Sequence, residues 1–203
     1  MITSAVAILF AVGYLLATVW LCRGIRLTAR DLCLGGIVCA MTLVLATIRI
    51  PLPTGSNITC GSWIPLMLLA LLYDYRLSML SGWVCGILAM ILIPGWQAVH
   101  WAQIFVQQLV CFSCLGYAGV FGSDKRWKIL CGGVLAIFIK FWAHVFSGVI
   151  FFSQNAWDGW GAWGYSLTYH LSSKIPEGVL SLAILMVLPL SALKKAAKGA
   201  AWT

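Results

Sequence analysis

The stretch ITSAVAILFAVGYLLATVWLC, residues 2–22, contains no charged residue and is followed at once by Arg23, Arg26 and Arg30. About 20 apolar residues in a helix are enough to cross the hydrocarbon core of a bilayer. A cleaved signal peptide carries its positive residues before the apolar stretch, which is the reverse of the order here. Because positive residues stay on the cytoplasmic side, the stretch predicts a retained transmembrane helix with its N-terminus outside.

The same alternation continues along the chain. Basic residues cluster in every second loop, whereas the loops at 51–62, 94–100 and 153–165 contain no Lys or Arg. This pattern is typical of a multi-pass protein of the bacterial cell membrane, and it places the C-terminus in the cytoplasm. In these basic loops and the C-terminal tail, the basic positions after the first group are Arg76, Lys125, Arg126, Lys128, Lys194, Lys195 and Lys198.

The composition indicates that the chain is embedded in a lipid bilayer. Of its 203 residues, 62% are hydrophobic and 9% are charged, and the mean hydropathy is +0.98. In a soluble protein, a net charge of +8 would suggest a nucleic-acid partner. Here ten of the thirteen basic residues border the cytoplasmic face, where anionic lipid is their natural partner. We therefore expect no nucleic acid to bind.

The apolar stretches predict an all-α polytopic membrane protein with seven spans. The third and fourth are short and are joined by a tight turn, so one of them is expected to be tilted or partly re-entrant. The spans are placed at 2–22, 31–49, 63–75, 78–95, 100–121, 129–152 and 166–192.

Polar side chains form stripes at helical spacing on the last three spans. With the predicted topology, all three stripes converge on the outer half of the bilayer. Polar groups at such depth line a cavity or join neighbouring helices by hydrogen bonds, and both interpretations remain open. The stripes are His100, Gln103 and Gln107; Lys140, His144 and Ser147; and Ser166, His170, Ser173 and Glu177.

Aromatic residues gather at the same level, among them Trp63, Trp101 and Tyr165. A small polar cluster walled by aromatic rings is what a binding pocket for a flat heterocycle needs. Lys174 and Glu177 lie three residues apart on the seventh span, and a charge at that depth would be costly alone. We expect them to form an internal ion pair.

Catalytic and metal-binding motifs are lacking. The sequence has no H-E-x-x-H, G-x-S-x-G, Walker A or dinucleotide-binding pattern, so it cannot hydrolyse ATP for transport by itself. No carboxylate or thiolate accompanies the histidines in the outer half, which argues against a metal site. We expect neither an enzyme nor a resident cofactor.

The stretch FWAHVFSGVIFF, residues 141–152, resembles a helix of the thiamine-specific substrate-binding (S) subunits of energy-coupling factor (ECF) transporters. The segments 165–167, 103–107, 116–121, 64–65 and 81–83 are similar to the same family. The resemblance runs from about residue 30 to 190 and covers six helices. It implies a six-helix S-component-like bundle in a substrate-binding domain at 27–203, with an extra N-terminal transmembrane helix at 1–26.

Position by position, the resemblance implies that His144 and Tyr165 contact the ligand. Gln107 stands where the family has a glutamate that meets an aminopyrimidine, and His170 stands where it has an asparagine. The polar stripes and aromatic residues add four more candidates. The full predicted substrate-binding set is Gln107, His144, Tyr165, His170, Gln103, Trp101, Trp63 and Ser147.

The family resemblance implies the function and the partners. The chain would capture thiamine, or a related pyrimidine or aromatic vitamin, at the extracellular face. A transmembrane coupling protein and two ATPase subunits would supply the energy from ATP. Two other functions remain open from the residues alone: a stand-alone secondary transporter of a small aromatic solute, and an intramembrane enzyme that uses His144 or His170.

Overall fold

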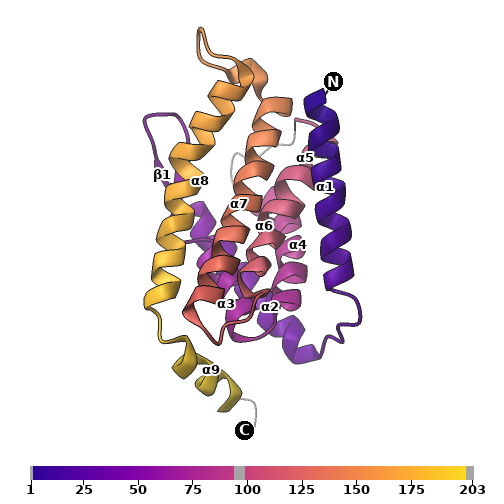
Figure 1. The fold of residues 1–203 in the computed structure, drawn as a ribbon, viewed down its shortest axis with the longest axis vertical. Coiled ribbons are helices and arrows are strands. Elements are labelled where there is room, and N and C mark those ends of the chain that lie inside the picture. Colours follow the sequence, from indigo (N-terminus) through magenta and orange to yellow (C-terminus); the bar gives the residue numbers. More distant parts are fainter. Residues whose placement is uncertain (1, 94–98, 200–203) are drawn as a thin grey trace.

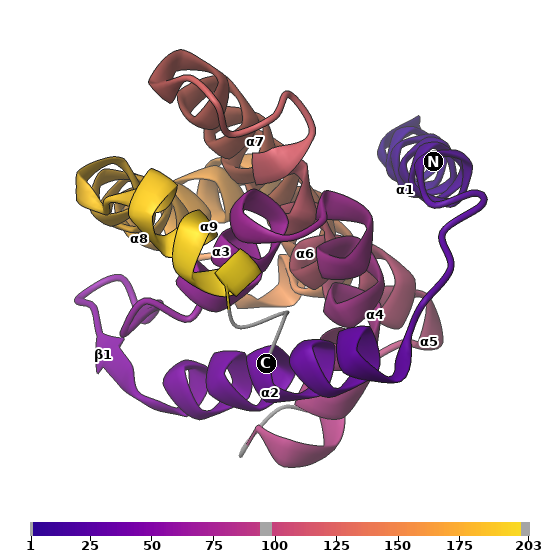
Figure 2. The same ribbon diagram turned by 90° about the horizontal axis from the view of Figure 1, so that it is seen from below.

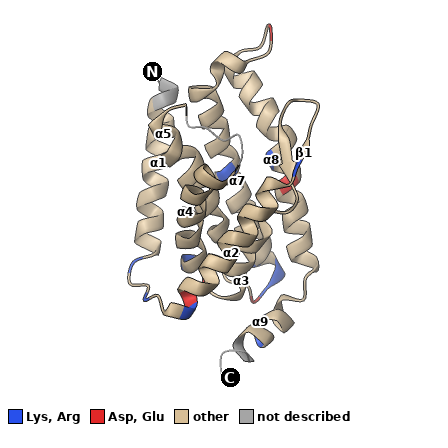
Figure 3. Ribbon diagram, turned by 180° about the vertical axis from the view of Figure 1, so that it is seen from behind, with Lys and Arg blue, Asp and Glu red and all other residues tan. Residues whose placement is uncertain are grey.

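The computed structural model describes residues 2–93 and 99–199, and side chains are placed from residue 5 to 93 and from 99 to 197. In this part of the chain, long helices form a bundle in which α1, α7 and α8 run along the long axis, while α2 crosses obliquely (Figures 1 and 3). Part of the loop predicted at 94–100 lies outside the described residues. The long helices are α1 (Ile2–Leu21), α2 (Ala29–Thr47), α4 (Tyr75–Leu92), α7 (Arg126–Phe151) and α8 (Ala162–Val187).

Charged residues gather at one end of the bundle, which we call the basic end (Figure 3). It contains the connections at 22–28, 73–74 and 122–125. Two helices begin there with side-chain caps. Thr28 and Asp31 form a capping box at the start of α2, and Asp74 accepts a hydrogen bond from the backbone of Arg76 at the start of α4. The opposite end holds the connection at 152–161.

The predicted fifth span is one continuous but irregular helical segment. It starts with α5 (Trp101–Gln103) and passes through the π-helix η1 (Ile104–Leu109), α6 (Val110–Ser113) and the 3-10 helix η2 (Cys114–Gly119). Close packing accompanies the irregularity: a Cβ atom on Gly82 of α4 would lie 2.5 Å from Ser113 Cα. Single π-turns inside helices occur frequently at functional sites.

Two strands interrupt the helical architecture. In place of the loop expected at 51–62, β1 (Arg49–Pro51) and β2 (Asn57–Thr59) pair in an antiparallel sheet with Arg49 opposite Thr59. Gly55 supplies the turn between them with φ of 81°, a value that residues with a Cβ rarely adopt. The hairpin precedes the short helix α3 (Ile64–Leu72), so a folded hairpin leads into the third predicted span.

Several predicted spans differ in length from the helices observed. On length and hydropathy, α2, α4 and α7 can each cross a membrane, and α8 with α9 (Leu190–Gly199) is a fourth candidate bent by 72°. The sequence predicts a seventh span that reaches residue 192, but α8 ends at Val187 because Pro189 cannot continue it. With nine residues, α3 measures only about 13 Å. It is too short to cross a bilayer alone.

Helix α1 lies at the margin of the bundle (Figure 2). It is tied to the irregular segment by two hydroxyl contacts: Tyr14 Oη lies 2.6 Å from Ser113 Oγ, and Thr18 Oγ1 lies 3.3 Å from Tyr117 Oη. Phe10 also packs against Phe146 of α7, with ring centroids 5.4 Å apart. The other side of α1 is apolar and exposed, which suits a helix in contact with lipid.

Candidate functional site

Two adjoining cavities lie among α7, α8, the hairpin and the irregular segment. The larger has a volume of about 320 Å³, at the low end of small-molecule sites, and the smaller has a volume of about 220 Å³. Four residues line both cavities and therefore mark their junction. They are Gln107, His144, Tyr169 and His170.

The histidines at the junction face each other from two helices. The rings of His144 on α7 and His170 on α8 meet edge to face at 5.3 Å between centroids. His144 Nδ1 lies 3.0 Å from the carbonyl oxygen of Lys140, which can only accept. In the neutral ring, Nδ1 therefore carries the proton and Nε2 is a hydrogen-bond acceptor. Nδ1 of His170 is buried without a hydrogen-bond partner in the described part of the chain.

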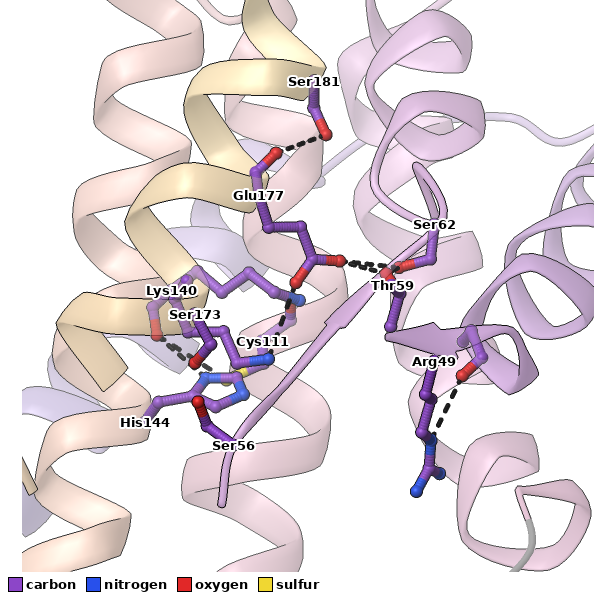
Figure 4. A network of polar contacts seen from close by, with 12 residues as sticks. Arg49, Ser56, Thr59, Ser62, Cys111, Lys140, His144, Ser173, Glu177 and Ser181 are labelled. Carbon is purple, nitrogen blue, oxygen red and sulfur yellow. Dashed lines mark hydrogen bonds and ion pairs between the residues drawn. The ribbon is translucent and has the colours of Figure 1, made fainter. Parts of the chain in front are cut away.

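Glu177 is the most buried charged residue of the site, with 1% of its surface exposed. Hydroxyl groups of Thr59 and Ser62 donate to its Oε1 atom, so the carboxylate links α8 to the end of the hairpin (Figure 4). Its Oε2 atom lies 3.6 Å from Lys174 Nζ and has no hydrogen-bond partner among the described residues. The ion pair expected from the sequence is thus present, and it borders the larger cavity.

Lys140 contributes a second buried ammonium group to the larger cavity. Its Nζ atom donates to the carbonyl oxygen of Cys111 at 2.7 Å. The same atom lies 4.8 Å from the ring centre of Trp63 and 5.0 Å from that of Phe112. A carbonyl oxygen and two ring faces stabilise a cation without a carboxylate, which explains how the residue is accommodated.

The hairpin closes one side of the larger cavity and is held to α8 by polar contacts. Thr54 and Ser56 hydroxyls lie 3.0 and 3.2 Å from Ser172 Oγ. The Tyr169 hydroxyl donates to the carbonyl oxygen of Gly55. The strand residues at 57 and 59 line the cavity wall.

Six of the eight predicted site residues line the cavities. Gln107, His144 and His170 lie at the junction, Trp63 lines the larger cavity, and Ser147 and Tyr165 line the smaller one. Gln103 is buried behind Gln107 and binds it rather than lining a cavity. Trp101 lies apart from both cavities with 68% of its surface exposed, so the structure does not bring it into the site.

Several lining residues fall outside the predicted set. Tyr169 is only a neighbour of the polar stripe on α8, yet it borders both cavities. Asn57, Thr59 and Ser62 belong to a stretch expected to be a loop, and Asn155 follows α7 at the smaller cavity. The run of polar residues just before Trp63 is the one available sequence signal for the hairpin's role.

Residues 5–93 and 99–197 contain no set of side chains that is suitable for binding a metal ion. In these ranges, no group of three or more His, Cys, Asp or Glu side chains comes close enough to hold a metal ion. Cys111 Sγ does lie 2.9 Å from His144 Nδ1, but that nitrogen already faces a carbonyl oxygen. The pair is a hydrogen bond between α6 and α7, so a thiol lies beside a histidine where the sequence predicted none.

Known proteins share this architecture. A solved structure of ThiT from Listeria monocytogenes superimposes with a TM-score of 0.71 at 21% identity, covering 81% of this chain and 95% of that one. Thiamine transporter ThiT of Bacillus subtilis is 27% identical over 161 residues, which are 73% of this chain and 83% of the relative. ThiT of Lacticaseibacillus paracasei is 28% identical over 139 residues, 62% of this chain and 69% of the relative.

The family model described as thiamine transporter protein (Thia_YuaJ) matches residues 32–197, which include both cavities and leave α1 outside. The match confirms the resemblance seen in residues 141–152 and rests on most of the chain. The relatives are transporters rather than enzymes, so the intramembrane-enzyme interpretation of His144 and His170 gains no support. The chain belongs to the thiamine transporter protein family.

Proposed function

We propose that this protein is the membrane-embedded capture subunit of an ECF-type uptake system and binds thiamine, or a closely related pyrimidine, in the two adjoining cavities. Its relatives are named thiamine transporter ThiT. The observation that carries the assignment is a pair of buried polar atoms at these cavities, His170 Nδ1 and Glu177 Oε2, which have no hydrogen-bond partner in the described protein. Buried groups of this kind are costly unless a ligand or water satisfies them.

The smaller cavity, which no Lys or Arg in the described part of the chain lines, suits a flat, positively charged heterocycle. Tyr165 and Tyr169 lie near each other, with ring centroids 5.5 Å apart, and aromatic faces attract cations. Among the described residues, Glu177 supplies the one carboxylate that lines the cavities. The positively charged residues that line the same larger cavity are Arg49, Lys140 and Lys174. We therefore place the cationic ring of thiamine against the tyrosines of the smaller cavity, away from the two ammonium groups.

The ligand enters from outside in this proposal. The basic end of the bundle is assigned to the cytoplasm by the positive-inside rule, and the hairpin and the 152–161 connection then face outward (Figure 3). A transmembrane coupling protein and two ATPase subunits supply the energy, since this chain has no nucleotide-binding motif. Helix α1, which precedes the family match at residue 32, is an addition to the six-helix domain.

An equilibrium titration of purified protein with thiamine, followed by tryptophan fluorescence and without ATP or partners, tests the proposal. We expect saturable binding by the wild type. His144→Ala removes a polar group at the junction, and the expected loss in affinity is roughly 5–150-fold. His100→Ala is the matched control, because His100 is exposed and caps α5 outside both cavities. Equal affinity in all three proteins would remove His144 from the site, and no saturable binding would refute the function.

A further inference from the structure

The direction of one amide side chain next to the cavities is fixed by a backbone group. The backbone N–H of Val99 can only donate, and it donates to Gln103 Oε1 at 2.9 Å. An amide side chain has its acceptor and its donors on opposite atoms. The orientation of Gln103 is therefore determined, and its Nε2 atom must donate to whatever lies beyond.

Beyond Gln103 lies Gln107, one helical turn further along. Gln103 Nε2 donates to Gln107 Oε1 at 2.8 Å, and the hydroxyl of Ser147 on α7 donates to the same oxygen at 2.8 Å. A carbonyl oxygen offers two lone pairs, so both are used within the protein. Gln107 has no acceptor left for a ligand.

The remaining polar atom of Gln107 is its amide nitrogen. Gln107 lines both cavities, and within the described residues its Nε2 atom donates to no protein group. Among the lining residues, the polar atoms that are both buried and without a partner are His170 Nδ1 and Glu177 Oε2. Gln107 Nε2 also lacks a partner among the described residues but is not buried in this sense. It is therefore accessible from the cavities. The π-helix η1 positions this residue, and such turns often mark functional sites.

We propose that Gln107 is a fixed hydrogen-bond donor that determines ligand specificity. The ligand turns the substituted position of its ring toward it, where an oxo acceptor is favoured over an amino donor. Gln103 acts as a positioning residue, because it holds the amide of Gln107 in the donating orientation without lining either cavity. The inference rests on the proposed function in one respect, namely that the ligand occupies these cavities.

Thiamine and oxythiamine are suitable probes, because they differ at one edge of the pyrimidine ring. The first has an amino donor beside an unprotonated ring nitrogen, and the second has an oxo acceptor beside a ring N–H. The quantity to measure is the ratio of thiamine affinity to oxythiamine affinity in each protein. In Gln107→Glu, a carboxylate that only accepts replaces the donor, and we expect the ratio to rise about tenfold. In Gln103→Met, the amide of Gln107 is free to rotate, and we expect a smaller rise of about threefold.

Gln154→Glu is the matched control, since Gln154 is exposed outside both cavities and makes the same change of charge. Its ratio should equal that of the wild type. An unchanged ratio in Gln107→Glu would overturn the donor assignment, and a change in Gln107→Glu without one in Gln103→Met would overturn the positioning role. If the wild-type protein binds both probes, the proposed function stands even when the donor assignment or the positioning role fails. If the wild-type protein binds neither probe, the proposed function and the donor assignment are both refuted.

Discussion

Glu177 illustrates how single residues are accommodated inside this bundle. One carboxylate oxygen is held by two hydroxyl groups near the hairpin, and the other is 3.6 Å from Lys174 Nζ. The ammonium group compensates the charge of the carboxylate, but Oε2 receives no hydrogen bond from the described residues. Removal of either partner of a buried pair leaves the other charge uncompensated.

This arrangement predicts a strong coupling between the two residues. Glu177→Leu alone leaves the ammonium group of Lys174 buried without a counter-charge, and it should destabilise the protein by about 3–5 kcal/mol. The double variant Lys174→Met, Glu177→Leu should recover much of that loss, because neither charge remains. Thermal unfolding in detergent measures both. Losses that simply add in the double variant would show that the pair is not coupled.

The spacing of polar residues along the sequence is enough to locate much of the site. The stripes on residues 140–147 and 166–177 correctly bring His144, Ser147 and His170 together, because α7 and α8 are regular helices over these positions. Trp101 is misplaced by the pattern: its segment begins at α5, three residues long, and its ring is exposed. The pattern does not predict that Tyr169 lines the cavities, because helical spacing alone does not tell which neighbour of a stripe borders a cavity.

Individual elements depend on close helix contacts at glycine. A Cβ atom at Gly82 would lie 2.5 Å from Ser113 Cα and 2.6 Å from its backbone nitrogen, whereas one at Gly36 of α2 would meet nothing within 4 Å. Backbone atoms cannot move away as a flexible side chain can. The contact between α4 and α6 therefore requires the missing side chain at Gly82.

The two glycines give a matched pair of substitutions. Gly82→Ala should lower stability by about 1–3 kcal/mol through overpacking. Gly36→Ala adds a methyl group in open space and should be neutral or stabilise by about 0.5–1 kcal/mol, as expected for glycine in a helix interior. Melting temperatures in detergent compare them. Equal effects at the two positions would contradict the packing described for α4 and α6.

Hydropathy predicts the elements well where they are long and regular. It places α2, α4 and α7 within a few residues, because each is an uninterrupted apolar helix. It does not reveal the hairpin at 49–59, where short strands are set by turn geometry and by contacts to α8 rather than by a long pattern. Nor does hydropathy distinguish a regular helix from one containing a π-turn, so it also misses the irregular form of residues 101–119.

At the scale of the whole molecule, the fold brings together the loops that the charge pattern assigns to one side of the membrane. The basic loops that alternate along the sequence gather at one end of the bundle (Figure 3). The N-terminal end of α1 lies toward the other end, with the 152–161 connection (Figure 1). The prediction of a multi-pass membrane protein is confirmed by the family, while its orientation stays a prediction.

Cysteine labelling at the two ends tests that orientation. In a variant with its native cysteines replaced, Asp158→Cys and Asp124→Cys place single thiols in exposed loops at opposite ends. A membrane-impermeant maleimide added to intact cells should label position 158 only, because the basic end is retained in the cytoplasm. Permeabilised cells provide the control, in which both positions should react. Labelling of position 124 alone in intact cells would show that the orientation is the reverse of the one predicted.

A structure of the protein bound to thiamine tests the position of the binding site. We predict that the ligand lies at the junction of the two cavities, with Gln107 Nε2 and His170 within hydrogen-bond distance of its polar atoms and a tyrosine ring against its heterocycle. The hairpin should remain in contact with α8 over the bound molecule. A thiamine molecule found elsewhere in the bundle, with both cavities empty, would contradict the site that we describe.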